Sequence, residues 1–166
     1  MFSFLIFSIA IILGFVGVVS LKRGAIFLPM ERRKLTEMLN VVKIIPGQKT
    51  LDLGSGDGRI VIAMAEAGAL AHGFEHNPIL VWWSRWKVKR KGLVGKAFIH
   101  NSNFWEEDFS SYSVITVFGI NYIMEKLEDK LTKETRIGTQ VISYLFPLPT
   151  WKPTAIKKGF YFYTRT

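Results

Sequence analysis

The chain has 166 residues, enough for one globular domain and little more. Apolar residues make up 49 % and charged residues 21 %, which excludes a disordered or fibrous protein. It has no cysteine, and its three histidines are too dispersed for a zinc site, so we expect no metal. The net charge of +9 should draw the chain to an anionic surface, either lipid headgroups or nucleic acid.

The first 21 residues carry no charged side chain. Residues 2–21 are mostly apolar and, as a helix, would span roughly 30 Å, the thickness of a bilayer core. A cleaved signal peptide would have basic residues before a shorter apolar run, and a buried core helix would have a polar face. We therefore predict a transmembrane anchor at 1–21 and a juxtamembrane connector at 22–29. The basic residues that follow the span predict a single-pass protein whose main domain faces the cytoplasmic or an equivalent side.

Residues 30–166 read as alternating helices and strands. Apolar residues recur at helical spacing from Leu35 to Val42, and a turn follows at 46–47. We then predict strands at 50–53, 70–74, 96–99, 113–118, 139–146 and 159–164, and helices at 59–67, 78–91 and 122–131. This alternation is typical of an α/β fold with a doubly wound, mostly parallel sheet.

The chemistry is expected at the glycine turn, residues 54–58, between the first strand and its helix. Alternate glycines let a backbone turn tightly and approach a ligand, and the next helix presents free N–H groups. Our candidate cofactor-binding residues here are Asp52, Gly54, Ser55, Gly56, Asp57 and Gly58.

Three details of the sequence narrow the class of ligand that this turn could bind. The spacing is G-x-G-x-G and not the G-x-G-x-x-G of dinucleotide-binding turns. Carboxylates at Asp52 and Asp57 would repel a pyrophosphate but could accept hydrogen bonds from an ammonium. Glu75, at the end of the second strand, is placed to accept the two hydroxyls of a ribose. These features favour S-adenosyl-L-methionine. The alternative is a structural glycine-rich turn, with Glu75 an ordinary surface acid.

The segments DLGSGDGR (52–59) and GFEHNP (73–78) resemble the first motifs of class I S-adenosylmethionine-dependent methyltransferases. The resemblance implies a Rossmann-like, seven-stranded sheet. It also implies that Asn103 takes the place of the acid that binds the adenine amino group, with Phe104 against the ring.

Two further segments, LEDKL (127–131) and FPLPTW (146–151), are similar to those of small membrane-anchored protein-lysine methyltransferases that act on the adenine nucleotide translocase and the ATP synthase c-subunit. The resemblance implies a protein substrate at or in the membrane. We expect Asn121 and Trp151 to be catalytic, and Tyr122, Phe146 and Phe27 are further candidates for the wall around the methyl group. The chain departs from the family after the fourth strand, where Phe118-Gly119-Ile120-Asn121 lacks the usual proline.

Residues 81–91, VWWSRWKVKRK, combine three tryptophans with five basic residues. They could form a solvated basic face with one tryptophan in the core, a lipid-contacting surface, or a nucleic-acid-binding surface. Nucleic acid is the least favoured partner. Two alternatives to a protein-lysine methyltransferase stay open: a methyltransferase for a small molecule or lipid, and a non-catalytic basic membrane tether.

Overall fold

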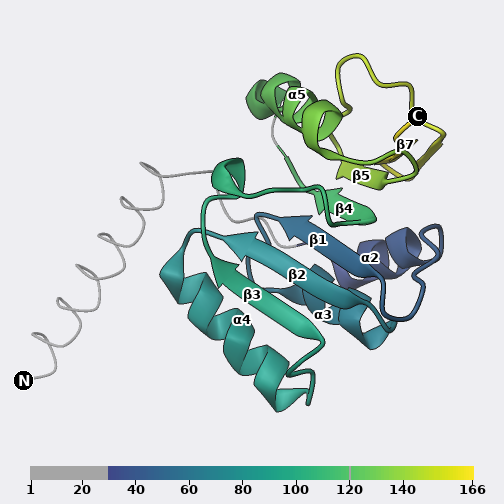
Figure 1. Ribbon diagram of the computed structural model, residues 1–166. Helices are drawn as coiled ribbons and strands as arrows, with labels where there is room; N and C mark the ends of the chain where they lie inside the picture. Colours follow the sequence, from purple (N-terminus) through teal and green to yellow (C-terminus); the bar gives the residue numbers. More distant parts are fainter. Residues whose placement is uncertain (1–29, 120) are drawn as a thin grey trace, which may run out of the picture.

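The computed structural model describes residues 30–119 and 121–166 (Figure 1). The predicted anchor at 1–21 and the connector at 22–29 lie outside these described residues. Within the described part, none of the helices is both long and apolar enough to cross a bilayer.

Helices and strands alternate along the chain, as predicted. The helices are α2 (Arg32–Leu39), α3 (Arg59–Glu66), α4 (Pro78–Arg90) and α5 (Met124–Glu134), and two short 3-10 turns are η1 (Phe104–Glu106) and η2 (Asn121–Ile123). The strands are β1 (Lys49–Leu53), β2 (Leu70–Glu75), β3 (Ala97–Asn101), β4 (Val114–Val117), β5 (Gln140–Tyr144), β6 (Ala155–Lys157) and β7 (Phe160–Thr164).

The strands form one seven-stranded sheet in the order β3-β2-β1-β4-β5-β7-β6. The first five strands in this order are parallel, whereas β7 is antiparallel to β5 and β6 is antiparallel to β7. The Rossmann-like, mostly parallel sheet is thereby confirmed. The strand order reverses between β1 and β4, and in open α/β sheets ligands bind at the carboxyl ends of the strands beside this reversal.

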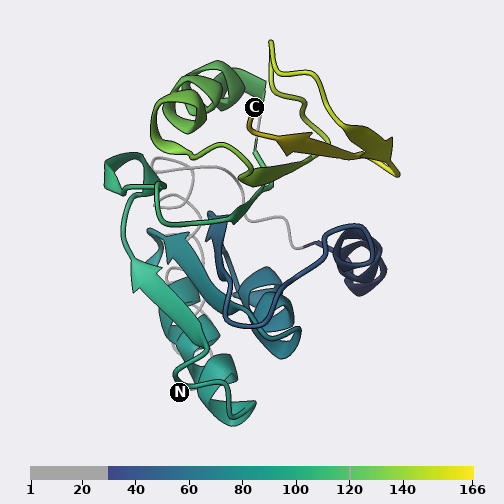
Figure 2. The ribbon, with the colours of Figure 1, turned by 45° about the vertical axis from the view of Figure 1, so that its right-hand side comes forward.

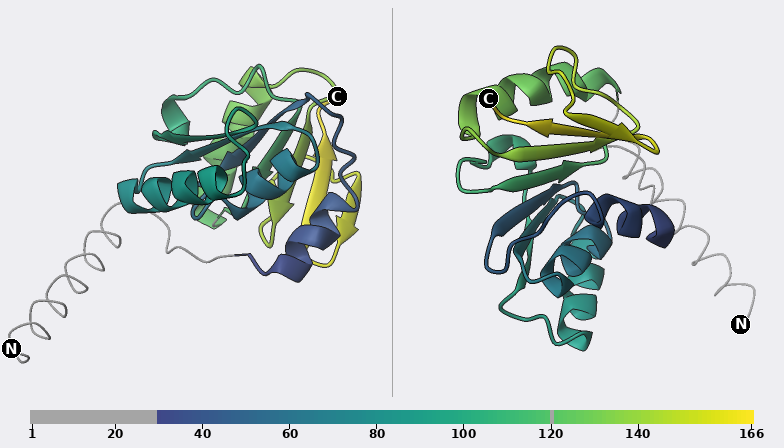
Figure 3. Two further views of the ribbon diagram at one scale, coloured as in Figure 1. Left: turned by 90° about the horizontal axis from the view of Figure 1, so that it is seen from below. Right: turned by 90° about the vertical axis from the view of Figure 1, so that its right-hand side faces the viewer.

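Helices cover both faces of the sheet (Figures 2 and 3), and an apolar core lies on each face. Buried residues of α2, α3 and α4, such as Met38, Val61 and Val88, pack on one face. Leu127 and Leu131 of α5 pack on the other. Apolar faces that are hidden in this way hold the helices against the sheet, so the carboxyl ends of the strands have a rigid support.

Some boundaries differ from the predictions. β5 ends at Tyr144 because Leu145 takes a positive φ of 67°, which ends the extended conformation. The strand β6 was not predicted because three residues with no alternation carry no periodic signal. It forms because Lys158 and Gly159, both with positive φ, turn the chain into a hairpin with β7. The helix predicted at 122–131 begins as η2 and continues as α5.

Candidate cofactor-binding and active site

The glycine turn lies at the carboxyl end of β1, beside the reversal of strand order. Gly54, Gly56 and Gly58 have φ values of 70°, 54° and 74°, which other residues adopt at a cost. The N–H groups of Gly54 and Ser55 donate to the carbonyl of Phe74 at 2.9 and 3.0 Å, which fastens the turn to β2. A Cβ added at Gly54 would meet none of the described residues within 4 Å beyond its chain neighbours, so a ligand can approach the backbone here.

Glu75, the last residue of β2, shapes the turn with its buried carboxylate. Its Oε2 accepts from the N–H of Gly56 at 2.9 Å, and its Oε1 accepts from the N–H of Asn77 at 2.8 Å. A carboxylate has about four acceptor positions, so these two bonds leave room for two hydroxyls. Glu75 therefore holds the turn in place and keeps acceptor positions free, and its role at a ribose stays a prediction.

Asp52 is buried in β1 beneath the turn. Its Oδ1 accepts from the hydroxyl of Thr116 on β4 at 2.7 Å. Burial, aided by the nearby carboxylates of Glu75 and Asp57, raises the pKa of Asp52 to about 7 against the lowering effect of the Thr116 hydrogen bond. A cationic group bound at the turn would favour the ionised form, so this site is electrostatically suited to a positively charged ligand.

Asp57 is bound by two cations of the chain itself. Its carboxylate lies 2.8 Å from Arg59 Nε and 2.7 Å from Lys87 Nζ on α4. Burial alone would raise the pKa of Asp57, but hydrogen bonds from Arg59 and Lys87 outweigh it and lower the pKa to about 2. Asp57 thus ties the turn to α4, a role that sequence reasoning missed. The hydroxyl of Ser84, also on α4, makes a second tie, because its proton is shared between the carbonyl of Gly56 at 2.9 Å and that of Leu80 at 2.6 Å.

The side chain of Ser55 points away from the open side of the turn. Its Cβ and Oγ lie 2.6 and 2.7 Å from where a Cβ on Gly73 would stand. The absence of a side chain at Gly73 therefore lets the turn lie directly on β2. The backbone groups of Ser55 are bonded within the fold, because its N–H donates to the carbonyl of Phe74 and its carbonyl accepts from the N–H of Gly58 at 2.8 Å, so Ser55 shapes the turn.

Asn103 lies at the same edge as Glu75, because the chain after β3 is bonded to the end of β2. The N–H of Ser102 donates to the carbonyl of Glu75, and the amide of Asn101 donates to the carbonyls of Glu75 and His76, all at 3.1 Å. Sequence reasoning did not single out Asn101, which makes two of these three bonds.

The amide of Asn103 has local partners. Its Oδ1 accepts from the N–H of Trp105 at 3.3 Å and its Nδ2 donates to Glu106 at 2.9 Å. The rings of Phe104 and Trp105 lie 4.7 Å apart. An adenine amino group would have to share or replace the weak bond to Trp105, whereas Phe104 offers an apolar ring at the same edge.

The expected substrate side lies at the carboxyl ends of β4 and β5. Asn121 and Tyr122 are exposed in η2, just after β4, at the same edge as the glycine turn. The ring of Phe118, which directly follows β4, lies 4.9 Å from the ring of Tyr144, the last residue of β5. Sequence reasoning missed this aromatic pair, although each of the two predicted strands carries an aromatic residue near its carboxyl end. Phe27 lies outside the described residues.

The structure does not bring Trp151 together with the glycine turn. Its Nε1 donates to the hydroxyl of Thr132 at 3.1 Å, and the guanidinium of Arg165 lies over its ring at 5.6 Å. The N–H of Arg165 bonds to the carbonyl of Thr139, which precedes β5. Trp151 therefore lies near the amino ends of the parallel strands, whereas the glycine turn lies at their carboxyl ends. This placement does not favour a catalytic role.

The rest of the segment 146–151 is held in place by buried groups. Glu128 of α5 accepts from the N–H and hydroxyl of Thr150 and from the N–H of Trp151. The hydroxyl of Tyr163 accepts from the N–H of Leu148 at 2.9 Å, and Phe146 packs on the core under α5. These contacts give the segment a structural role.

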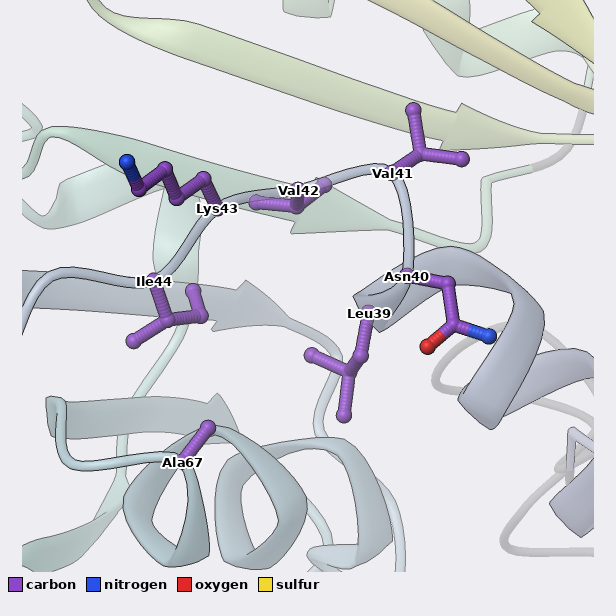
Figure 4. A pocket seen from close by; sticks show the side chains of 7 residues that line it. All are labelled: Leu39, Asn40, Val41, Val42, Lys43, Ile44 and Ala67. Carbon is purple, nitrogen blue, oxygen red and sulfur yellow. The ribbon is translucent and has the colours of Figure 1, made fainter.

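A hollow of about 440 Å³ lies far from this site (Figure 4). It is lined by Leu39, Asn40, Val41, Val42, Lys43, Ile44 and Ala67. Residues 39–44 lead into the amino end of β1, and Ala67 follows the end of α3, so the hollow opens at the sheet edge opposite the glycine turn. Within 30–119 and 121–166, no group of three or more His, Asp or Glu side chains could hold a metal ion.

Comparison with known proteins identifies the family. Residues 52–155 match the model of the ANTKMT methyltransferase domain. The chain belongs to this family. The ANTKMT domain begins at Asp52, within β1, and runs to the start of β6, so it contains the glycine turn, Glu75 and the segment 146–151. The resemblance noted from the sequence is thereby confirmed.

Three similar proteins bear names that concern methyl transfer. The chain is 43 % identical over 129 residues to the ATP synthase c-subunit lysine N-methyltransferase of Rattus norvegicus, covering 76 % of this chain and 58 % of the relative. It is 33 % identical over 134 residues to a protein-lysine N-methyltransferase of Saccharolobus islandicus, covering 80 % and 83 %. An RNA methyltransferase of Salinibacter ruber, solved with S-adenosyl-L-homocysteine, has a TM-score of 0.76 at 30 % identity and covers 83 % and 92 %. The chain spans a little over half the length of the ATP synthase c-subunit lysine N-methyltransferases of Rattus norvegicus and Homo sapiens.

Proposed function

We propose that this protein is an S-adenosyl-L-methionine-dependent protein-lysine N-methyltransferase that acts on a protein in or near a membrane. The observation that carries the proposal is the glycine turn, closed by Glu75 and underlain by Asp52, at the strand reversal of an ANTKMT methyltransferase domain. Two relatives named as lysine methyltransferases, one of them nearly matched in length, support lysine as the acceptor.

The residues at the turn fit S-adenosyl-L-methionine. Glu75 would accept the ribose hydroxyls, and the open face of Gly54 would receive the methionine part of the ligand. Asp52 and Glu75 would supply the negative field that a sulfonium and an ammonium require. Phe104 would lie against the adenine.

The cofactor supplies a methyl group that is already activated, so the chain needs neither a metal nor a covalent nucleophile. Its task is to hold the acceptor amine in line with the methyl group at near-attack distance. Phe118 and Tyr144 are placed at the strand ends to form an apolar wall, and Asn121 follows β4 beside them. An apolar wall disfavours the charged form of an entering lysine and so helps it lose its proton.

The membrane part of the proposal rests on residues 2–21. They are uncharged over a length that suits a bilayer, and basic residues follow them. We propose one membrane span with the methyltransferase domain on the cytoplasmic or an equivalent side. Such an anchor raises the local concentration of a membrane substrate without adding a contact at the active site.

Methyl transfer to membrane extracts tests the proposal. The full chain, in mild detergent, is incubated with radiolabelled S-adenosyl-L-methionine, and the label is sorted into protein, lipid and RNA. We expect label in protein, recovered as methyllysine after acid hydrolysis. Label only in lipid would support a lipid methyltransferase, and label only in RNA would agree with the name of the Salinibacter protein. Either result would refute a lysine acceptor.

Calorimetric titration tests the cofactor site separately. Glu75→Gln should weaken binding of S-adenosyl-L-methionine by about 1–3 kcal/mol, because a neutral amide loses charge-assisted bonds to the ribose and to the turn. Glu66→Gln, a surface change on α3, is the matched control and should bind as the wild type does. A wild-type chain that binds no cofactor at millimolar concentration would favour the non-catalytic tether.

A further inference from the structure

The outer face of α4 exposes a row of large apolar side chains. Residues 79, 82, 83 and 86 follow helical spacing and so share one side of the helix. The buried side of α4 is smaller, with Val81, Ser84 and Val88 against the sheet. We call the exposed row the tryptophan stripe; its members and exposed fractions are Ile79 (57 %), Trp82 (67 %), Trp83 (43 %) and Trp86 (41 %). The interpretation that one tryptophan of 81–91 lies in the core is therefore wrong.

The stripe is continuous and ends in positive charge. The rings of Trp83 and Trp86 stack at 4.9 Å, and the guanidinium of Arg90 lies 5.2 Å from the Trp86 ring. Three other cations of 85–91 are engaged within the fold: Arg85 with the Ile99 carbonyl, Lys87 with Asp57, and Lys91 with Glu66. Lys89 and Arg90 form no ion pair with any acid in the part of the chain that the structure describes.

We propose that the tryptophan stripe is a membrane-contacting surface that lies in the headgroup layer of an anionic bilayer. Tryptophan rings prefer this layer because one edge is polar and the body is apolar. Lys89 and Arg90 would bind lipid phosphates beside the rings. Four large apolar side chains exposed on one face of a helix are typical of a surface that binds a partner.

Shape and chain length favour lipid over nucleic acid. α4 lies at the β3 end of the sheet (Figure 1), and its buried side chains face the sheet, so the stripe faces outward. Ile79 offers no ring on which a base could stack. Eight residues, 22–29, separate the uncharged run at 2–21 from Met30, and eight extended residues reach at most about 29 Å. An inserted anchor would therefore hold the domain within reach of the bilayer surface.

This placement also orients the candidate active site. α4 begins three residues after Glu75 and packs on β2 and β3, so one end of the stripe lies at the cofactor edge of the sheet. With the stripe on the bilayer, the strands would run along the membrane and the site would open sideways. A lysine at headgroup level would then be in reach, which deepens the proposed function and, in this respect, rests on it.

Tryptophan fluorescence with brominated lipids tests the surface in the full chain. The protein has five tryptophans, three of them in the stripe. One variant, Trp105→Phe with Trp151→Phe, leaves only the stripe to emit. The matched control variant replaces Trp82, Trp83 and Trp86 by Phe and leaves Trp105 and Trp151. In vesicles of phosphatidylcholine and phosphatidylglycerol, we expect brominated lipids to quench the first variant at least threefold more strongly than the control.

The charge requirement is tested by a second pair of variants. Lys89→Gln with Arg90→Gln should remove the extra quenching seen in anionic vesicles compared with pure phosphatidylcholine. Lys133→Gln with Arg136→Gln, which removes the same charge elsewhere, should leave it unchanged. Equal effects of the two pairs would refute the assignment of lipid phosphate to Lys89 and Arg90.

Three results would overturn the proposal: equal quenching of the stripe and control tryptophans, no quenching of the stripe, or stripe emission that responds to an RNA oligonucleotide but not to brominated lipid. Calorimetry with S-adenosyl-L-methionine on the same samples separates this outcome from failure of the proposed function. A chain that binds cofactor but leaves the stripe unquenched refutes the surface alone. A chain with a quenched stripe and no cofactor binding refutes the enzyme alone.

Discussion

Replacing Asp52 by Asn should change how the stability of the protein depends on pH. The pKa of Asp52 is raised from 3.8 to about 7, chiefly by burial. The folded state therefore binds more protons than the unfolded state between these two values, so the stability that Asp52 contributes is complete below pH 3.8 and is lost as pH rises through 7. At about 1.4 kcal/mol per pKa unit, the loss between pH 5 and pH 8 amounts to about 3 kcal/mol.

The variant isolates this effect from other titrations. Burial, with help from nearby His100 and Lys49, lowers the pKa of His72 to about 4. His72 therefore makes stability fall as pH decreases from 6.5 to 4, the opposite slope, but it does so equally in both proteins. The amide oxygen of Asp52→Asn can still accept from Thr116, and any cost of its NH₂ group is independent of pH.

The measurement is urea unfolding of the full chain in mild detergent, followed by tryptophan emission at pH 5, 6, 7 and 8. We expect the free energy of unfolding of Asp52→Asn, relative to the wild type, to rise by about 3 kcal/mol across this range. The same variant should bind S-adenosyl-L-methionine more weakly at pH 8, because it lacks the ionised carboxylate. A difference between the two proteins that stays constant with pH would refute the assigned pKa and the electrostatic account of the site.

Three further changes probe other parts of the fold. Gly73→Ala should destabilise the protein by about 1–3 kcal/mol, because the new Cβ would lie 2.6 Å from a methyl of Val61. It should also weaken cofactor binding in the calorimetric assay, and unchanged affinity would contradict the close packing of the turn on β2. Glu128→Gln should lower the free energy of unfolding in urea by about 1–3 kcal/mol, whereas Glu125→Gln on the exposed side of the helix should leave it unchanged. Equal effects would show that the bonds of Glu128 to Thr150 and Trp151 do not stabilise the fold. The free energy of unfolding of His72→Gln, relative to the wild type, should fall as pH rises from 4 to 6.5, and a thermal melt series in which this difference stays constant would assign the effect to another group.

Most of the fold could be predicted from the sequence, because its strongest signals are local. The parallel strands are short apolar runs, and the helices between them carry apolar stripes that need a sheet to cover them. What periodicity could not predict depends on backbone details: the positive φ of Leu145 that shortens β5, and the hairpin at Lys158 that creates β6. The anchor at 1–21 stays a prediction, since it lies outside the described residues.

The candidate site was predictable where chemistry and spacing coincide, as at Asp52 and Glu75. It was not predictable where a side chain's partner lies far along the chain. The sequence predicts Asp57 to be a ligand-binding acid, but in the structure its carboxylate binds Lys87, which lies thirty residues later in the chain. The sequence predicts Trp151 to be part of the active site, but its contacts with Thr132 and Arg165 place it near the amino ends of the parallel strands, away from the glycine turn.

The two ties between the glycine turn and α4 have a thermodynamic consequence. Lys87 and Ser84 reach from α4 to Asp57 and Gly56, while the opposite side of the same helix carries the tryptophan stripe. Linkage is reciprocal, so whatever factor a lipid surface applies to nucleoside affinity, the nucleoside applies to lipid affinity. Through α4, contact with the membrane would therefore change the affinity for S-adenosyl-L-methionine, and bound S-adenosyl-L-methionine would change the affinity for the membrane.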